Sequence, residues 1–139
     1  MKLSRLPLML LLAQPWSVQA AAPAYSVDPA ISTVRSGGFW ESKQHHGHYR
    51  VVIAHLGVEH IQSNIRIEWM LDATPSAPAT LERSEVLHEL LLGSVDVESM
   101  QWSDKGTEIV LSGPLHNGSQ YRCRLHLGTD GSITKGAGC

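Results

Sequence analysis

The sequence predicts an all-β fold, either an antiparallel β-sandwich or a small open barrel, formed by a single domain over residues 21–139. From Ser32 onward, short segments of alternating apolar and polar residues recur, and Gly, Pro, Asn and Asp residues separate them. Long segments with the 3.6-residue apolar period of a helix are not evident. Both observations indicate antiparallel strands that each bury one face.

Two strands are predicted on either side of Gly57. Residues 49–53 alternate, and in residues 60–71 the apolar side chains face one way while the polar ones face the other. We predict an odd-length loop around Gly57 that closes at or near His55 and Glu59, because this places both apolar sets on one face. The expected cross-strand pairs are Ile53 with Ile61, Val51 with Ser63, and Tyr49 with Ile65.

Residues 72–79 form a predicted linker or long turn, because two prolines interrupt them. Residues 84–92 are compatible with two structures. Ser84 as N-cap and Gly93 directly after the segment suit a short helix. The strand-like segments on both sides favour a strand instead, and we predict the strand.

The C-terminal third contains a predicted hairpin and two further strands. Residues 95–102 and 107–112 flank a turn at residues 103–106. Residues 120–127 alternate strictly, and a short strand follows at residues 132–134. The face of 120–127 that we expect to be buried consists of Tyr121, Cys123, Leu125 and Leu127.

Residues 1–20 have the pattern of a bacterial-type signal peptide. A positively charged start precedes a short apolar run, and Val18 and Ala20 are the small residues that signal peptidase requires. The run is too short to span a hydrocarbon core of ~30 Å, and no cysteine follows it for lipid attachment. We therefore expect cleavage between Ala20 and Ala21 and a soluble periplasmic or secreted protein without a membrane anchor.

The charge balance argues against nucleic acid as a partner. The chain has 11 Lys and Arg, 13 Asp and Glu, and a net charge of −2, which becomes −4 once Lys2 and Arg5 leave with residues 1–20. No basic stripe is available to neutralise phosphates. The partner classes that remain are a protein and a small ligand, and the sequence specifies neither.

The two cysteines, Cys123 and Cys139, predict one disulfide bond, since an exported chain reaches an oxidising compartment. The bond would close a loop of roughly 17 residues, for which chain-entropy arguments give about 3 kcal/mol of stabilisation. It would hold the Gly-rich C-terminal tail against the strand that contains Cys123.

His45, His46 and His48 are the only dense cluster of potential metal ligands. Neutral imidazole suits Zn, Cu or Ni, so a divalent transition metal is the one cofactor that the sequence suggests. In the expected register, Glu68 lies opposite His46 and could add an oxygen ligand, whereas Arg66 opposite His48 would place a positive charge beside the metal. A solvated His-rich start of a strand is the favoured alternative.

Two further groups of side chains are candidates for ligand contact. His55, Glu59 and His60 flank the Gly57 turn, where an imidazole and a carboxylate could touch a ligand at a hairpin tip. Four aromatic residues could form a sugar-stacking platform, although packing in the core is the favoured alternative. They are Phe39, Trp40, Trp69 and Trp102.

No catalytic motif is recognisable, because the chain lacks Gly-x-Ser-x-Gly, His-Glu-x-x-His and a Gly-rich phosphate loop. Catalytic residues therefore stay unassigned. We expect a non-enzymatic binding or interaction protein. The alternatives are a periplasmic metal-binding protein that uses the histidine cluster and a small hydrolase whose site forms only in three dimensions.

Overall fold

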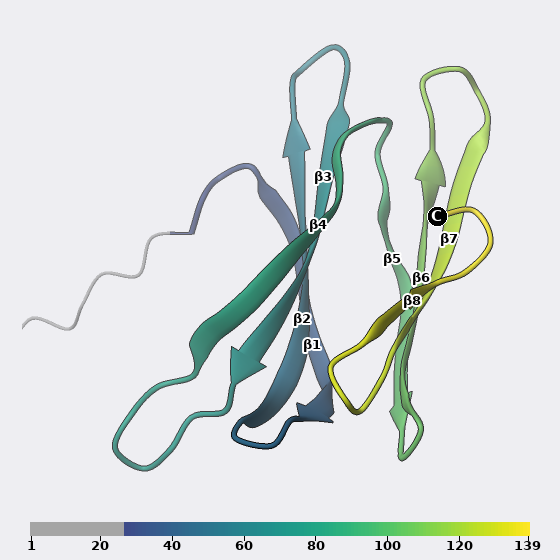
Figure 1. Cartoon of the computed structure of the whole chain (residues 1–139). Helices are drawn as coiled ribbons and strands as arrows, with labels where there is room; N and C mark the ends of the chain where they lie inside the picture. The colour runs from purple at the N-terminus through teal and green to yellow at the C-terminus, as the bar shows by residue number, and fades with distance from the viewer. Residues whose placement is uncertain (1–26) are drawn as a thin grey trace, which may run out of the picture.

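The structure, a computed structural model, describes residues 27–139 and is all-β in this part of the chain (Figure 1). Its eight strands are β1 (Ile31–Glu41), β2 (His46–Leu56), β3 (Gln62–Leu71), β4 (Thr80–Leu92), β5 (Asp96–Ser103), β6 (Gly106–Pro114), β7 (Gln120–Leu127) and β8 (Ile133–Lys135). The expected signal peptide and its cleavage site lie outside the described residues. Within them, no helix is long and apolar enough to cross a membrane.

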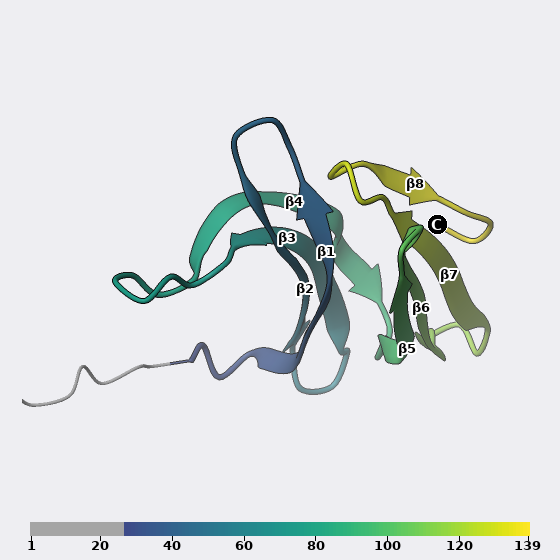
Figure 2. The same cartoon turned by 90° about the horizontal axis from the view of Figure 1, so that it is seen from below.

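The strands form two antiparallel four-stranded sheets, in the order β1-β2-β3-β4 and β5-β6-β7-β8. Every strand pairs with its neighbour in sequence, so each sheet is a simple meander. The chain passes from the first sheet to the second at residues 93–95. Figure 2 shows the two sheets facing each other, with β1 beside β5 along one side.

The hydrophobic core fills the space between the two sheets. The alternation predicted for residues 49–53 and 120–127 is confirmed, because every second side chain in β2 and β7 is buried. The fully buried large apolar side chains come from both sheets. They include Tyr49, Ile53, Ile65, Ile67, Trp69, Ile109, Leu111, Leu125 and Leu127.

The expected register of the β2–β3 hairpin is wrong by four residues. The observed pairs are Tyr49 with Trp69, Val51 with Ile67, and Ile53 with Ile65, and the strands close at Leu56 and Gln62. A shift by an even number of residues keeps the same side chains on the inner face, so alternation alone does not distinguish the two registers. The observed one continues the ladder to Gly47 and Leu71 and brings the rings of Tyr49 and Trp69 into edge contact at 5.8 Å.

Residues 84–92 are part of strand β4, as predicted. The segment pairs with β3 along its length. This pairing determines that it forms a strand, although its local helix and strand propensities are similar. Three irregularities interrupt this pairing. In the described part of the chain, β4 is one of the two edge strands of its sheet, and such bulges discourage further strand pairing at an exposed edge.

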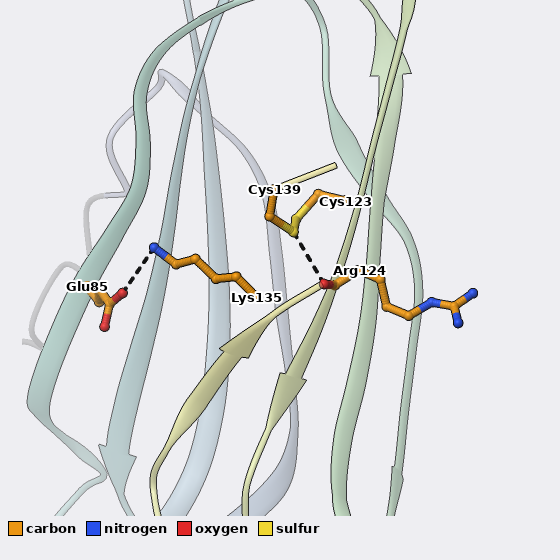
Figure 3. Close-up of a disulfide and its surroundings, with 5 residues drawn as sticks. All are labelled: Glu85, Cys123, Arg124, Lys135 and Cys139. Carbon is orange, nitrogen blue, oxygen red and sulfur yellow. Dashed lines mark hydrogen bonds and ion pairs between the residues drawn. A yellow bond between two sulfur atoms is a disulfide. The ribbon is translucent and has the colours of Figure 1, made fainter. Parts of the chain in front are cut away.

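The predicted disulfide between Cys123 and Cys139 is present, with the two Cα atoms 4.7 Å apart (Figure 3). Hydrogen bonding holds the tail against β7 as well, because the Gly136 amide donates to the Arg124 carbonyl at 2.8 Å. On the same side of the molecule, Lys135 of β8 reaches across to Glu85 of β4 at 3.5 Å. Side chains therefore link the two sheets on the side opposite β1 and β5.

Candidate functional site

The three histidines that are clustered in the sequence have different partners in the structure. His45 lies in the turn before β2, and its Nδ1 is 2.9 Å from a Glu82 carboxylate oxygen. His48 Nδ1 is 2.7 Å from Asp72, while the exposed His46 pairs with Glu41 in the β1–β2 ladder. Among residues 27–139, no three His, Cys, Asp or Glu side chains come together in a way that could hold a metal ion.

Glu68 lies opposite Arg50 rather than opposite His46, a correction that follows from the four-residue change of register. Its carboxylate accepts hydrogen bonds from Arg50 Nε at 2.6 Å and from Arg66 Nε at 2.7 Å. The residue is only 2% exposed. Glu68 is therefore engaged in a structural ion-pair network and is not oriented toward the histidine cluster.

The residues at the β2–β3 hairpin tip also separate. His55 Nε2 is 3.0 Å from the Val95 carbonyl, which fixes this nitrogen as the donor. Glu59 is exposed. The ring of His60 packs against that of His116, with centroids 5.1 Å apart and the planes at 80°. The sequence did not single out His116, because it lies alone in a loop 56 positions further along the chain.

Two of the four candidate aromatic residues belong to the core, as the favoured alternative predicted. Trp40 and Trp69 are 4% and 2% exposed, and each indole N–H donates to a backbone carbonyl at 3.1 Å. Phe39 and Trp102 remain at the surface, with 46% and 60% of their area exposed. A platform made from all four rings is therefore not formed.

Trp102 lies at the end of β5, and its ring covers Gly37 of β1. A Cβ atom at position 37 would come within 2.7 Å of the indole, so only a residue without a side chain lets the ring lie so close to the strand. The ring borders a hollow of about 390 Å³ between β1 and β5. The other lining residues are Arg35, Ser36, Val97, Glu98, Ser99 and Met100.

A second hollow, of about 350 Å³, lies where the start of β4 meets the β7–β8 loop. Arg83 occupies the face of Trp69 there, with its guanidinium carbon 3.8 Å from the ring centroid, and it donates to the Gly131 carbonyl at 2.8 Å. Hydrogen bonds from the Ser132 hydroxyl and amide lower the pKa of Asp130, which lines the same hollow. The polar side chains Arg83 and Asp130 that line this hollow are therefore already hydrogen-bonded within the protein.

Ser42, His45 and Glu82 bring a hydroxyl, an imidazole and a carboxylate to one place. The Ser42 hydroxyl, however, donates to the His45 backbone carbonyl at 3.2 Å and accepts from the His45 amide at 3.1 Å. A catalytic serine is instead hydrogen-bonded to the imidazole that takes its proton. Ser42 and His45 therefore close the turn before β2, and Glu82 of β4 holds the His45 ring.

Two tyrosines and one histidine have shifted pKa values because of burial. Desolvation raises the pKa of Tyr49 to about 12, and its hydroxyl donates to the Gly128 carbonyl. Burial also raises the pKa of Tyr121, whose ring packs edge-on against His88 at 5.6 Å. The pKa of His88 is lowered by burial and by Lys135. These groups lie in the core or between the sheets, away from the Trp102 hollow.

Comparison with protein-family models, with curated proteins and with solved structures finds no match for this chain.

Proposed function

We propose that the chain is an exported, non-enzymatic binding protein that takes a hydroxyl-rich ligand, such as a saccharide, on the exposed face of Trp102. The observation that carries this proposal is the placement of Trp102: the six-membered ring of its indole lies against Gly37, and 60% of the residue's area is open beside a hollow. An indole offers a large apolar surface that is normally buried, so its exposure beside a hollow favours a binding role.

The hollow matches this ligand chemistry. Its volume of about 390 Å³ lies within the usual range for small-molecule sites. Val97 and Met100 supply apolar surface, and Arg35, Ser36 and Ser99 supply polar groups around it. A sugar ring stacks its C–H face on an indole and directs its hydroxyl groups to such polar neighbours. Glu98 is already paired with Arg122 at 2.8 Å, so the anionic charge of the hollow is partly neutralised.

The test is calorimetric titration of the purified protein with a panel of soluble oligosaccharides, beside the Trp102→Ala variant. We expect binding that Trp102→Ala weakens at least about ten-fold, as loss of a central aromatic contact does. Phe39→Ala is the matched control, because it removes an exposed ring that does not line the hollow. No binding to any saccharide, or equal binding by the parent and Trp102→Ala, would contradict the proposal.

A further inference from the structure

The pair formed by His60 and His116 joins the two sheets at one end of the molecule. His60 lies in the β2–β3 loop of the first sheet, and His116 lies in the β6–β7 loop of the second. Both loops are at the top in Figure 1, with the β4–β5 connection between them. We propose that these two imidazoles form a binding site for a single divalent transition-metal ion, separate from the Trp102 hollow and from the cluster at residues 45–48.

The spacing of the rings fits two ligands of one ion. Imidazole nitrogens bind zinc at about 2.0–2.1 Å, and each ring centroid lies about 1.1 Å further out. A nitrogen–metal–nitrogen angle of about 90–110° then puts the two centroids about 4.5–5.2 Å apart. The observed separation between His60 and His116 is 5.1 Å. Both residues are exposed, so each ring can turn a nitrogen toward the ion and solvent can complete its coordination.

Backbone hydrogen bonds hold the loops that carry these two rings next to each other. The Gly93 amide donates to the Ile61 carbonyl at 3.0 Å, next to His60. The His116 amide donates to the Leu92 carbonyl at 3.2 Å. Both loops are thus attached to adjacent residues, Leu92 at the end of β4 and Gly93 at the start of the β4–β5 connection, one position or less from each histidine. The two ligands are held near each other before the ion arrives, which reduces the entropic cost of binding.

The loops themselves are constrained by tight turns. Gly57 has a φ of +86°, and a Cβ atom there would lie 2.6 Å from the His60 carbonyl oxygen. In the second loop, the Leu115 amide donates to the Ser119 carbonyl at 2.9 Å, and the Gly118 amide donates back to the Leu115 carbonyl at 3.0 Å. The two turns therefore constrain the backbone at His60 and His116.

The site has a consequence for the whole molecule. An ion shared by His60 and His116 links the first sheet to the second by a bond that forms only in the folded state. Binding to the native state alone raises stability in proportion to the logarithm of the ion concentration. Zn²⁺, Ni²⁺ and Cu²⁺ are the suitable ions, since imidazole prefers them to Mg²⁺ or Ca²⁺.

The experiment is a Zn²⁺ titration of the ¹⁵N-labelled protein, with the ring nitrogens of all histidines followed by NMR. We expect the signals of His60 and His116 to move together with one dissociation constant. In His60→Ala, the affinity at His116 should fall at least about ten-fold, and His116→Ala should weaken binding at His60 equally. His126→Ala is the matched control, because this half-buried histidine is paired with Glu108 elsewhere on the second sheet.

A second measurement does not depend on any one variant being well folded. Zn²⁺ should raise the unfolding temperature of the parent and of His126→Ala by the same amount, and that of His60→Ala by less. Different dissociation constants for His60 and His116 in the parent would show that the rings merely pack edge to face. An unchanged affinity at one histidine after loss of the other would overturn the proposal as well.

Discussion

Two adjacent glycines in β1 meet different neighbours. Gly38 has a φ of +69°, and a Cβ atom there would overlap the hydroxyl of Thr107, which is fully buried. Gly37 is not in the left-handed region, and its Cβ would meet only the ring of Trp102, an exposed side chain that can move. Strand β1 therefore needs Gly38 for its backbone conformation and Gly37 for the placement of the Trp102 ring.

We expect Gly38→Ala to lower the free energy of unfolding by about 2 kcal/mol or more, from backbone strain and overpacking. Gly37→Ala should cost less than about 1 kcal/mol, since only an exposed ring must shift. It should instead change the tryptophan fluorescence spectrum and weaken saccharide binding. Urea unfolding and fluorescence measure both effects, and equal losses of stability in the two variants would contradict this interpretation.

Glu68 is a buried carboxylate between two arginines, Arg50 and Arg66, which are each about one-third exposed. We expect Glu68→Gln to lower the free energy of unfolding by about 1.5–3 kcal/mol, the range for hydrogen bonds to charged groups. The loss stays below that of a fully buried pair, because both guanidinium groups reach solvent. Glu82→Gln, which alters only the exposed pair with His45, should cost less than about 1 kcal/mol in the same urea experiment.

His88 gives the fold a dependence on pH. Burial lowers its pKa from the ordinary 6.5, and Lys135 lowers it further. The unfolded chain then binds more protons than the folded one, so stability should fall as the pH drops below about 6.5 toward the lower folded pKa, with no contribution above about pH 7. Among residues 27–139, its buried Nε2 also has no hydrogen-bond partner.

The corresponding variant is His88→Leu, which removes the titrating ring and its unsatisfied nitrogen. Its free energy of unfolding should fall less between about pH 7 and pH 5 than that of the parent, because the imidazole no longer has to stay neutral in the folded state. Urea unfolding at several pH values measures this difference. An identical pH dependence in the two proteins would assign the effect to other groups.

At the scale of strands, the period-two pattern predicted which side chains are buried but not which residues face each other. Val51 and Ile53 lie on the inner face in the expected register and in the observed one. Polar partners do depend on the register, and for this reason the predicted proximity of Glu68 to His46 failed. Strand β4 shows a similar limit of local sequence patterns. Its residues 84–92 are compatible with a helix or a strand, and pairing with β3 makes them a strand.

The C-terminal tail depends on its disulfide. Cys123 is fully buried in β7, and Cys139 is the exposed end of the bond. We expect Cys139→Ser to lower the free energy of unfolding by about 2–4 kcal/mol, because the unfolded chain loses a cross-link. The reduced parent protein should unfold at the same urea concentration as the variant. An unchanged midpoint in Cys139→Ser would mean that the bond stabilises nothing.

At the scale of the whole molecule, the all-β antiparallel class could be predicted, but the surface that we propose for binding could not. Alternation and turn residues indicated antiparallel strands. The Trp102 hollow forms only because β1 lies beside β5, which is the fourth strand after β1 in the chain and belongs to the other sheet. No local sequence pattern predicts that β5 lies beside β1. His60 and His116 also meet only because loops of different sheets lie at the same end of the molecule.

The disulfide and the proposed export are connected, because this bond forms and persists in an oxidising compartment. We expect protein recovered from the periplasm or the medium to begin at Ala21, since Val18 and Ala20 suit signal peptidase. A cut after Ala22 would place Pro23 directly beyond the broken bond, where it is unfavourable. Intact-mass measurement should therefore give residues 21–139 with two hydrogen atoms fewer than the reduced chain. A chain produced without residues 1–20 should stay in the cytoplasm with both thiols free, and recovered product that retains Met1 would contradict the proposed export.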